Sequence, residues 1–188
     1  MLRLRIGWLS MALMATVLGL EPKAEATTVE AMSLDEMARR AEMIFIGRPL
    51  GSRVGWNAER TRIYTYVTLE VERFLKGGGT GEGQVTIRLW GGRIGDVMAV
   101  VPGTPTFTPG EEVLLFCAGA RARGPTVLGL SLGKFTLATD STGERILKRD
   151  ISGLILARHR TGSRQVGAPP VRYRLSEVEA RIQRALAQ

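Results

Sequence analysis

Cysteine and histidine are scarce, with one of each in 188 residues, and this excludes several kinds of site. A single cysteine, Cys117, cannot form an intramolecular disulfide, so we expect packing alone to stabilise the fold. Nucleophilic hydrolysis needs a histidine that exchanges protons near neutral pH. The only candidate is His159, and it lies between two positively charged residues, Arg158 and Arg160, which makes it a poor candidate for this role. Zinc sites need three or four ligands at short spacings, which one cysteine and one histidine cannot supply. We therefore predict no catalytic residue, no metal ligand and no cofactor.

Apolar runs long enough to cross a bilayer are also missing. Arg3 and Arg5 precede an interrupted apolar stretch over residues 6–20, and the triplet Ala24-Glu25-Ala26 follows it. This stretch is shorter than the roughly 20 residues that a membrane span needs. The pattern is typical of a cleavable signal peptide over residues 1–26, with Thr27 as the first mature residue. We expect a secreted or periplasmic protein without a transmembrane anchor after cleavage; the alternative is a retained anchor.

Acidic residues are depleted in the last quarter of the chain. Residues 27–144 contain 13 basic and 13 acidic residues, whereas residues 145–188 contain 10 basic and 3 acidic ones. Arg158, Arg160 and Arg164 stand among glycine and proline, which predicts a basic linker over residues 157–174. For an exported chain, an anionic envelope polymer, an acidic lipid surface or an acidic protein face is a better partner than nucleic acid. The alternative is a solvated tail without a partner.

Two short helices are predicted at the ends of the mature chain. Ser33 and Glu36 have the spacing of a capping box, and Ser176 and Glu179 repeat it before a C-terminal helix over residues 175–188. Apolar residues recur at every fourth position of the second helix, so it has a narrow apolar stripe. We interpret both helices as packing elements that cover a β surface.

Between the helices the apolar period drops to two, which predicts strands. The expected strands cover residues 43–46, 63–75, 85–89, 113–116, 127–130, 134–139 and 146–148. Residues 113–116 are apolar on both faces and are expected to form a buried central strand, with Cys117 beside it. Residues 91–110 are rich in glycine and proline and are predicted to form a long structured loop, in which residues 97–101 are a candidate short pairing segment. Short strands with glycine at corners favour a closed or nearly closed antiparallel barrel over residues 27–156, together with the first helix.

Exposed aromatic side chains are the predicted contact surface. Tyr64 and Tyr66 are expected on the outward face of the longest strand, and Trp56 and Trp90 lie in or beside loops. Their rings could stack on sugars, bases or peptide. The alternative is that each ring packs beneath a terminal helix or the long loop.

Two segments together resemble a known family. The segment AEMIFIGR at residues 41–48 and the segment YTYVTLEVERFLKG at residues 64–77 are similar to the first two strands of netrin-like modules and tissue inhibitors of metalloproteinases. The segments at residues 91–95 and 109–116 are similar to those of a group of uncharacterised exported bacterial proteins. The resemblance implies a small five-stranded OB-like antiparallel barrel with short N- and C-terminal helices.

The inhibitors chelate the protease zinc through an N-terminal cysteine, which this chain lacks. After cleavage Thr27 would offer an α-amine and a carbonyl of the same chemical type. We therefore predict an exported, non-catalytic binding module that is protein-binding or peptidase-inhibitor-like, with a metallopeptidase among its candidate partners. The alternative is an envelope-associated structural module that contacts anionic polymer through its basic C-terminal segment. The predicted contact residues are Thr27, Trp56, Tyr64, Tyr66, Trp90, Arg158, Arg160 and Arg164.

Overall fold

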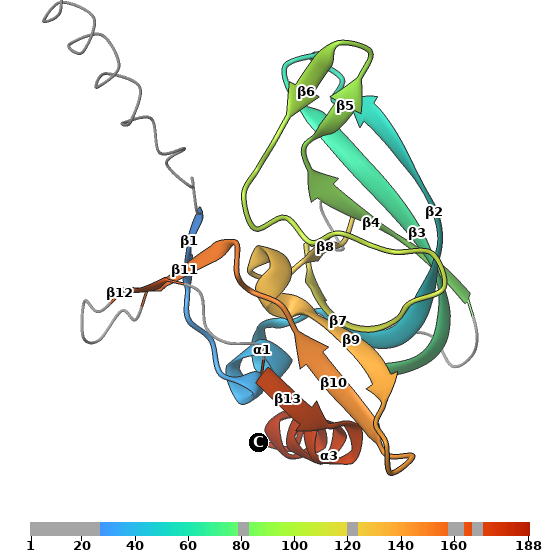
Figure 1. The fold of residues 1–188 in the computed structure, drawn as a ribbon, viewed down its shortest axis with the longest axis vertical. Helices are drawn as coiled ribbons and strands as arrows, with labels where there is room; N and C mark the ends of the chain where they lie inside the picture. The colour runs from blue at the N-terminus through green and yellow to red at the C-terminus, as the bar shows by residue number, and fades with distance from the viewer. Residues whose placement is uncertain (1–26, 79–82, 120–123, 158–163, 167–170) are drawn as a thin grey trace, which may run out of the picture.

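A computed structural model describes residues 27–78, 83–119, 124–157, 164–166 and 171–188 (Figure 1). The fold of these residues is mainly β with short helices. The strands are β1 (Thr27–Glu30), β2 (Met43–Trp56), β3 (Ile63–Lys76), β4 (Gly83–Trp90), β5 (Gly92–Ile94), β6 (Val97–Ala99), β7 (Glu112–Ala118), β8 (Thr126–Val127), β9 (Lys134–Thr139), β10 (Arg145–Arg149), β11 (Leu154–Ala157), β12 (Arg164–Val166) and β13 (Val171–Arg174). The helices are α1 (Leu34–Arg40) and α3 (Leu175–Leu186), and a 3-10 turn covers Leu130–Gly133.

The main sheet has eight strands, in the order β13-β10-β9-β7-β2-β3-β4, with β8 paired to β7. A second sheet contains β1, β11 and β12, and β5 pairs with β6 in a hairpin. The prediction of a five-stranded barrel is therefore wrong, because the main sheet has more strands and does not close. Strands β9, β10 and β13 extend the sheet beyond β7, and its two edges, β13 and β4, do not pair. One backbone hydrogen bond, from Arg88 N to Pro125 O at 2.8 Å, links β4 to the residue before β8.

The long strands β2 and β3 bend because their pairing shifts register three times. One shift lies between Ile46 and Gly47, where a Cβ on Gly47 would lie only 2.4 Å from the carbonyl oxygen of Glu70. Glycine is therefore required for this close approach of two backbones. The apolar side chains of β2 alternate between two separate clusters, since Ile44 and Ile46 pack in one cluster and Phe45 packs in the other.

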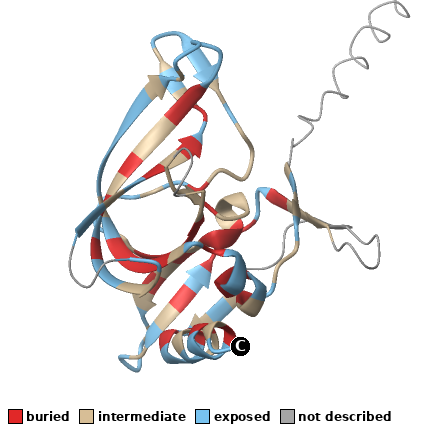
Figure 2. Cartoon of the chain, turned by 180° about the vertical axis from the view of Figure 1, so that it is seen from behind, coloured by how far each residue is buried: buried red, intermediate tan, exposed pale blue. Residues whose placement is uncertain are grey.

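Strand β7 contributes to both clusters by simple alternation. Val113, Leu115 and Cys117 pack in the cluster on the β3–β4 side, whereas Leu114 and Phe116 pack in the cluster that includes the helices. All five side chains are buried (Figure 2). The predicted buried central strand is thus confirmed. Desolvation raises the pKa of the buried Cys117 thiol to about 12, which suits an unreactive packing residue.

The helices begin differently. At α1 the predicted capping box is confirmed, since Ser33 N donates to Glu36 Oε2 at 2.8 Å and Glu36 N donates to Ser33 Oγ at 3.2 Å. Helix α3 begins at Leu175 instead, directly after β13, and no side chain caps it. The predicted second capping box at Ser176 is therefore wrong, because the strand runs straight into the first helical turn. The apolar stripe of α3 does pack on the main core.

The predicted basic linker over residues 157–174 contains two strands. Strand β12 pairs with β11, and β13 pairs with β10 as an edge of the main sheet. Val171 and Tyr173 alternate with arginines in β13, so a short period-two pattern was hidden by the basic composition. Neither described helix is long and apolar enough to cross a bilayer.

Candidate binding site

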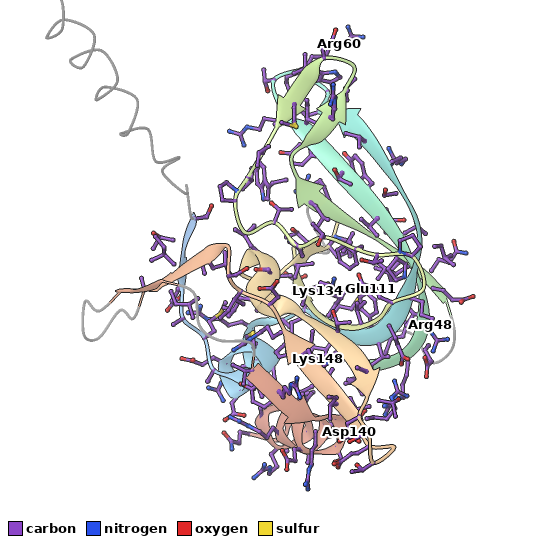
Figure 3. All side chains as sticks on the ribbon, in the orientation of Figure 1. Arg48, Arg60, Glu111, Lys134, Asp140 and Lys148 are labelled. Carbon is purple, nitrogen blue, oxygen red and sulfur yellow. The ribbon has the colours of Figure 1, made fainter. Side chains whose placement is uncertain are left out.

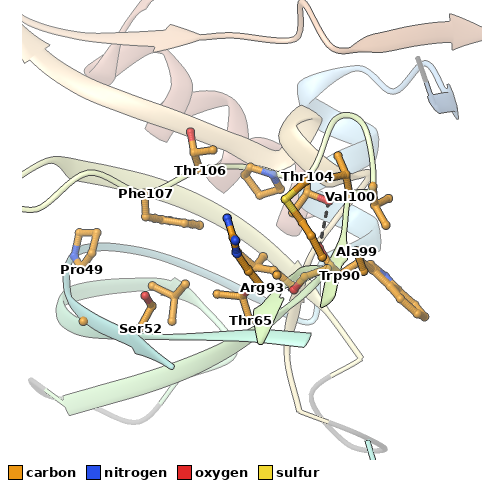
Figure 4. Close-up of a pocket in the computed structure, with 18 of the residues that line it drawn as sticks. Pro49, Ser52, Thr65, Trp90, Arg93, Ala99, Val100, Thr104, Thr106 and Phe107 are labelled. Atoms are coloured by element: carbon orange, nitrogen blue, oxygen red, sulfur yellow. Dashed lines mark hydrogen bonds between the residues drawn. The ribbon is translucent and has the colours of Figure 1, made fainter. Parts of the chain in front are cut away.

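A pocket of about 590 Å³ lies between the end of the β2–β3–β4 sheet and residues 91–109 (Figure 4). Its lining is dominated by apolar side chains. They come from both walls: Pro49, Leu50, Val67 and Leu89 on the sheet, and Met98, Ala99, Val100, Val101, Pro105, Phe107 and Pro109 on the covering segment. This size and composition are typical of sites that bind an apolar ligand with a few polar contacts.

The covering segment begins where the chain leaves β4. Gly91 and Gly92 take φ values of +88° and +139°, which turn the chain back over the sheet. A Cβ on Gly92 would lie 2.6 Å from Val54 Cγ1 and 2.8 Å from Thr65 Oγ1, so β5 rests directly on the β2–β3 face. Thr65 Oγ1 also donates to Gly91 O at 2.8 Å. The glycines and Thr65 therefore fix one end of the pocket.

A charged pair fixes the opposite wall. Lys134 Nζ donates to Thr106 O and to Glu111 Oε1, the latter at 2.8 Å (Figure 3). Glu111 Oε1 also accepts from Thr108 N at 2.8 Å, and Lys134 Nζ lies 4.6 Å from the ring centroid of Phe107. Both charged side chains are only 12% exposed. Because these contacts hold three consecutive residues of the segment, the wall is formed before any ligand arrives.

The pocket lining includes one ionisable side chain, Arg93 of β5. Its Nε donates to Gly95 O at 3.0 Å, and its guanidinium points into the pocket between Phe107 and Thr104 (Figure 4). The two terminal nitrogens have no hydrogen bond or ion pair with any described residue. Thr104 Oγ1 is already engaged, since it donates to Trp90 O at 3.4 Å. Arg93 is therefore the group that would recognise an anionic part of a ligand.

One edge of β2 runs beside the pocket. Asn57 N donates to Arg62 O at 2.9 Å, so these two residues form a hydrogen-bonded pair. Hydrogen-bonded and non-hydrogen-bonded pairs alternate from this pair along the β2–β3 ladder. Antiparallel strands turn every second residue toward the neighbour, so the N–H and C=O groups of Ser52, Val54 and Trp56 point away from β3. Within the described ranges no strand pairs with this half of β2, since β7 pairs only with Met43 to Gly47. An unpaired strand edge therefore adjoins an apolar pocket.

The predicted aromatic residues do not form one platform. Tyr64 and Tyr66 lie on the face of β3 opposite Thr65, but their rings are covered by Arg88 at 4.8 Å and Arg53 at 4.2 Å. Tyr64 also contacts Trp90, with ring centroids 5.1 Å apart, and is only 6% exposed. The expectation that Tyr64 is outward and exposed is therefore wrong, because cross-strand neighbours cover it.

Trp56 and Trp90 are both 38% exposed. Trp90 is among the residues around the pocket, although its ring points away from the cavity (Figure 4). Trp56 ends the unpaired edge of β2. Sequence reasoning thus selected two residues near the site for their aromatic character and for their place beside loops.

The remaining predicted contact residues lie away from the pocket or outside the described ranges. Thr27 begins β1, where it pairs with Leu154 of β11. Arg158 and Arg160 lie outside the described residues, as does His159. Arg164 begins β12, where its backbone pairs with Ala157.

Sequence reasoning missed most of the pocket because it interpreted residues 91–110 as a long structured loop, with residues 97–101 only as a short pairing segment; residues 97–99 do pair, as β6 with β5. The signal was the run of five apolar residues VMAVV at 97–101 within that segment. Val97, Met98 and Val100 are 51%, 64% and 69% exposed. Consecutive exposed apolar residues in a glycine-rich and proline-rich segment are typical of an interaction site.

Arg149 at the end of β10 is a second cation that forms no ion pair with any carboxylate of the described residues. It is 9% exposed, its Nε makes no hydrogen bond, and its guanidinium carbon lies 5.1 Å from the ring centroid of Phe135. Desolvation lowers its pKa below the ordinary arginine value, an effect that Tyr173 partly opposes. Arg149 is not among the residues around the pocket, so we interpret it as a destabilising feature of the core.

No group of three or more histidine, cysteine, aspartate or glutamate side chains is placed to hold a metal ion within the part of the chain that the structure describes. The prediction of no metal site concerns the whole chain and stays a prediction. Comparisons of the chain with protein-family models, with curated proteins and with solved structures gave no match, so the netrin-like resemblance also stays a prediction.

Proposed function

We propose that this protein is an exported, non-catalytic binding module that accepts an extended apolar segment of a partner protein. The observation that carries the proposal is the pocket of about 590 Å³ beside the unpaired edge of β2. An extended peptide can add to such an edge through its main chain while alternate side chains enter a pocket. The apolar walls supply affinity, and the strand edge supplies orientation.

The chemistry of the lining supports binding over catalysis. General acid-base catalysis needs groups that gain and lose a proton near the working pH. The pocket is lined by Arg93 and by hydroxyl, apolar and glycine residues, without a carboxylate, thiol or imidazole among them. The buried Cys117 thiol lies in the sheet and has a pKa of about 12, which makes it a poor nucleophile.

A preformed wall lowers the cost of binding. Ordering a loop on association costs free energy that is subtracted from the affinity. The contacts of Lys134 and Glu111 with Thr106 and Thr108 already hold residues 106–108 of the covering segment. This wall of the site therefore needs no ordering when the partner binds.

A basic surface between the helices favours a second candidate, contact with an anionic envelope polymer. A cavity of about 310 Å³ is lined by Arg39 of α1 and by Arg181 and Arg184 of α3, together with Asp35. Asp35 binds Arg181 through both carboxylate oxygens, at 3.2 and 3.3 Å, and Arg181 lowers the pKa of Asp35. Three guanidinium groups therefore surround one carboxylate.

The experiment compares two adjacent exposed residues of the β6 region. Met98 lines the pocket, whereas Val97 does not, and both are more than half exposed. Wild type, Met98→Asp and Val97→Asp are used as bait for culture medium and envelope extract. We expect the same partner protein with wild type and Val97→Asp, and at least tenfold less of it with Met98→Asp. Equal recovery by all three would contradict the pocket as the binding site.

The two candidates differ in their response to salt. Contact with a polymer through Arg39 and Arg184 weakens steeply as ionic strength rises, because exposed charges are screened. Binding in the apolar pocket changes little over the same range. Recovery that is abolished by salt and is unaffected by Met98→Asp would favour the polymer over the protein partner.

A further inference from the structure

We propose that the pocket recognises the free C-terminal carboxylate of the bound peptide, and that Arg93 binds it. The inference rests on the proposed function, because it names which part of the partner enters the pocket. It combines three observations: an unpaired strand edge, an apolar cavity beside it, and one cation aimed into the cavity.

The charge of the lining gives the first step. Arg93 is the sole charged residue among those around the pocket, and no carboxylate lies there to neutralise it. Its Nε is held by Gly95 O, so the two terminal nitrogens are left to donate into the pocket. A guanidinium binds a carboxylate through two parallel hydrogen bonds, which are stronger than bonds between neutral groups. The cavity is thus complementary to a ligand that is apolar and carries one negative charge.

The position of Arg93 gives the second step. A Cβ on Gly92, the preceding residue, would lie against Val54 and Thr65, so β5 lies over the β2–β3 face beside Val54, the middle residue of the unpaired edge. The edge extends from Ser52 to Trp56, and the N–H and C=O groups of Ser52, Val54 and Trp56 point away from β3. A peptide that pairs there would lie beside β5, whose Arg93 side chain enters the pocket. A carboxylate attached to the main chain, the C-terminus, is therefore the anion that fits.

The strand edge also decides between a peptide and a small amphiphile. A fatty acid would match the apolar walls and Arg93, but it has no amide groups for the outward N–H and C=O groups of Ser52, Val54 and Trp56. A peptide satisfies all three features. Binding an internal segment would cover Arg93 with apolar surface and leave its charge unpaired, which costs free energy.

The test uses fluorescein-labelled heptapeptides of alternating threonine and valine, with the last three positions drawn from apolar residues. Each pool is made with a free C-terminal carboxylate and with a C-terminal amide. Fluorescence anisotropy measures binding to the full chain as wild type, Arg93→Met, Arg93→Lys and Arg53→Met. Arg53 is the matched control, since it lies over Tyr66 on the opposite face of the sheet. Circular dichroism confirms that each variant is folded.

We expect wild type and Arg53→Met to bind the free-acid pool at least tenfold more tightly than the amide pool, the scale of a hydrogen-bonded charge pair. Arg93→Met should lose this preference, and Arg93→Lys should keep a reduced one. Equal binding of acid and amide pools would overturn the carboxylate inference and leave the proposed function standing. A preference that persists in Arg93→Met would overturn the role of Arg93. Binding of sodium decanoate without binding of either pool would overturn both proposals.

Discussion

Replacing Lys134 by methionine should destabilise the protein and loosen one wall of the pocket. The substitution removes the bonds from Lys134 Nζ to Thr106 O and Glu111 Oε1. It leaves the Glu111 carboxylate, which is only 12% exposed, with the bonds from Thr108 N and Thr136 Oγ1. Losing one partner of a buried ion pair costs about 3 to 5 kcal/mol, and partial exposure reduces this to about 2 to 3 kcal/mol.

The double variant gives the more informative measurement. Glu111→Gln alone leaves Lys134 with a weaker acceptor, whereas Lys134→Met with Glu111→Gln leaves no unpaired charge. We therefore expect the double variant to be less destabilised than the sum of the single variants, by about 1 to 2 kcal/mol. Urea unfolding followed by tryptophan fluorescence measures the free energy of unfolding of all four proteins.

Binding of the peptide pools supplies the second readout. Lys134→Met should weaken binding of the free-acid pool by about tenfold, because residues 106–108 must then become ordered on association. Additivity of the two single substitutions within about 0.5 kcal/mol, together with unchanged peptide affinity, would refute the reasoning. The pair would then be incidental to the pocket.

Three further experiments test the packing of the fold. Gly47→Ala should lower the free energy of unfolding by about 1 to 3 kcal/mol, because the new Cβ would lie 2.4 Å from Glu70 O. The control Gly51→Ala places its Cβ in open space and should change the free energy of unfolding by less than about 0.5 kcal/mol. Equal effects in urea unfolding would contradict this bulge geometry. Arg149→Met should raise the free energy of unfolding by about 1 to 3 kcal/mol, because it removes a buried charge that no described carboxylate neutralises, and a loss of stability would count against that interpretation. Iodoacetamide at pH 8 should label Cys117 only as fast as the protein unfolds, as followed by mass spectrometry, and rapid labelling of the folded protein would contradict its burial.

Alternating apolar residues predicted the central strands well. The pattern from Ile63 to Leu75 corresponds to β3, and the fully apolar residues 113–116 lie in β7, which is buried on both faces. The capping box at Ser33 predicted α1 because both of its hydrogen bonds are local. These features depend on neighbours in the sequence, so a pattern is enough to find them.

The architecture depends on contacts between distant segments, which the pattern did not give. One edge of the main sheet is formed by β13, which pairs with β10 and lies in a segment that composition marked as a linker. The burial of Tyr64 depends on Trp90 and Arg88 of the neighbouring strand. The alternation of apolar residues along one strand assigns each side chain to a face of the sheet, but it does not show which other residues cover that face.

The candidate site was predicted only at its margins. Trp56 and Trp90 were selected as exposed aromatic residues, and they lie at the end of the β2 edge and beside the pocket. Arg93 was not selected, because its importance comes from the fold-back at Gly91 and Gly92 that points it into an apolar cavity. Composition alone shows an arginine in a glycine-rich loop.

Amide hydrogen exchange along β2 tests the central claim most directly, namely that a peptide pairs with the unpaired edge beside the pocket. Exchange is followed by NMR for each residue from Ser52 to Trp56, with and without the free-acid peptide pool. We predict that binding slows exchange at Ser52, Val54 and Trp56, whose N–H groups point away from β3, and leaves Arg53 and Gly55 nearly unchanged. Uniform protection of all five amides, or protection of none with the peptide bound, would contradict the account.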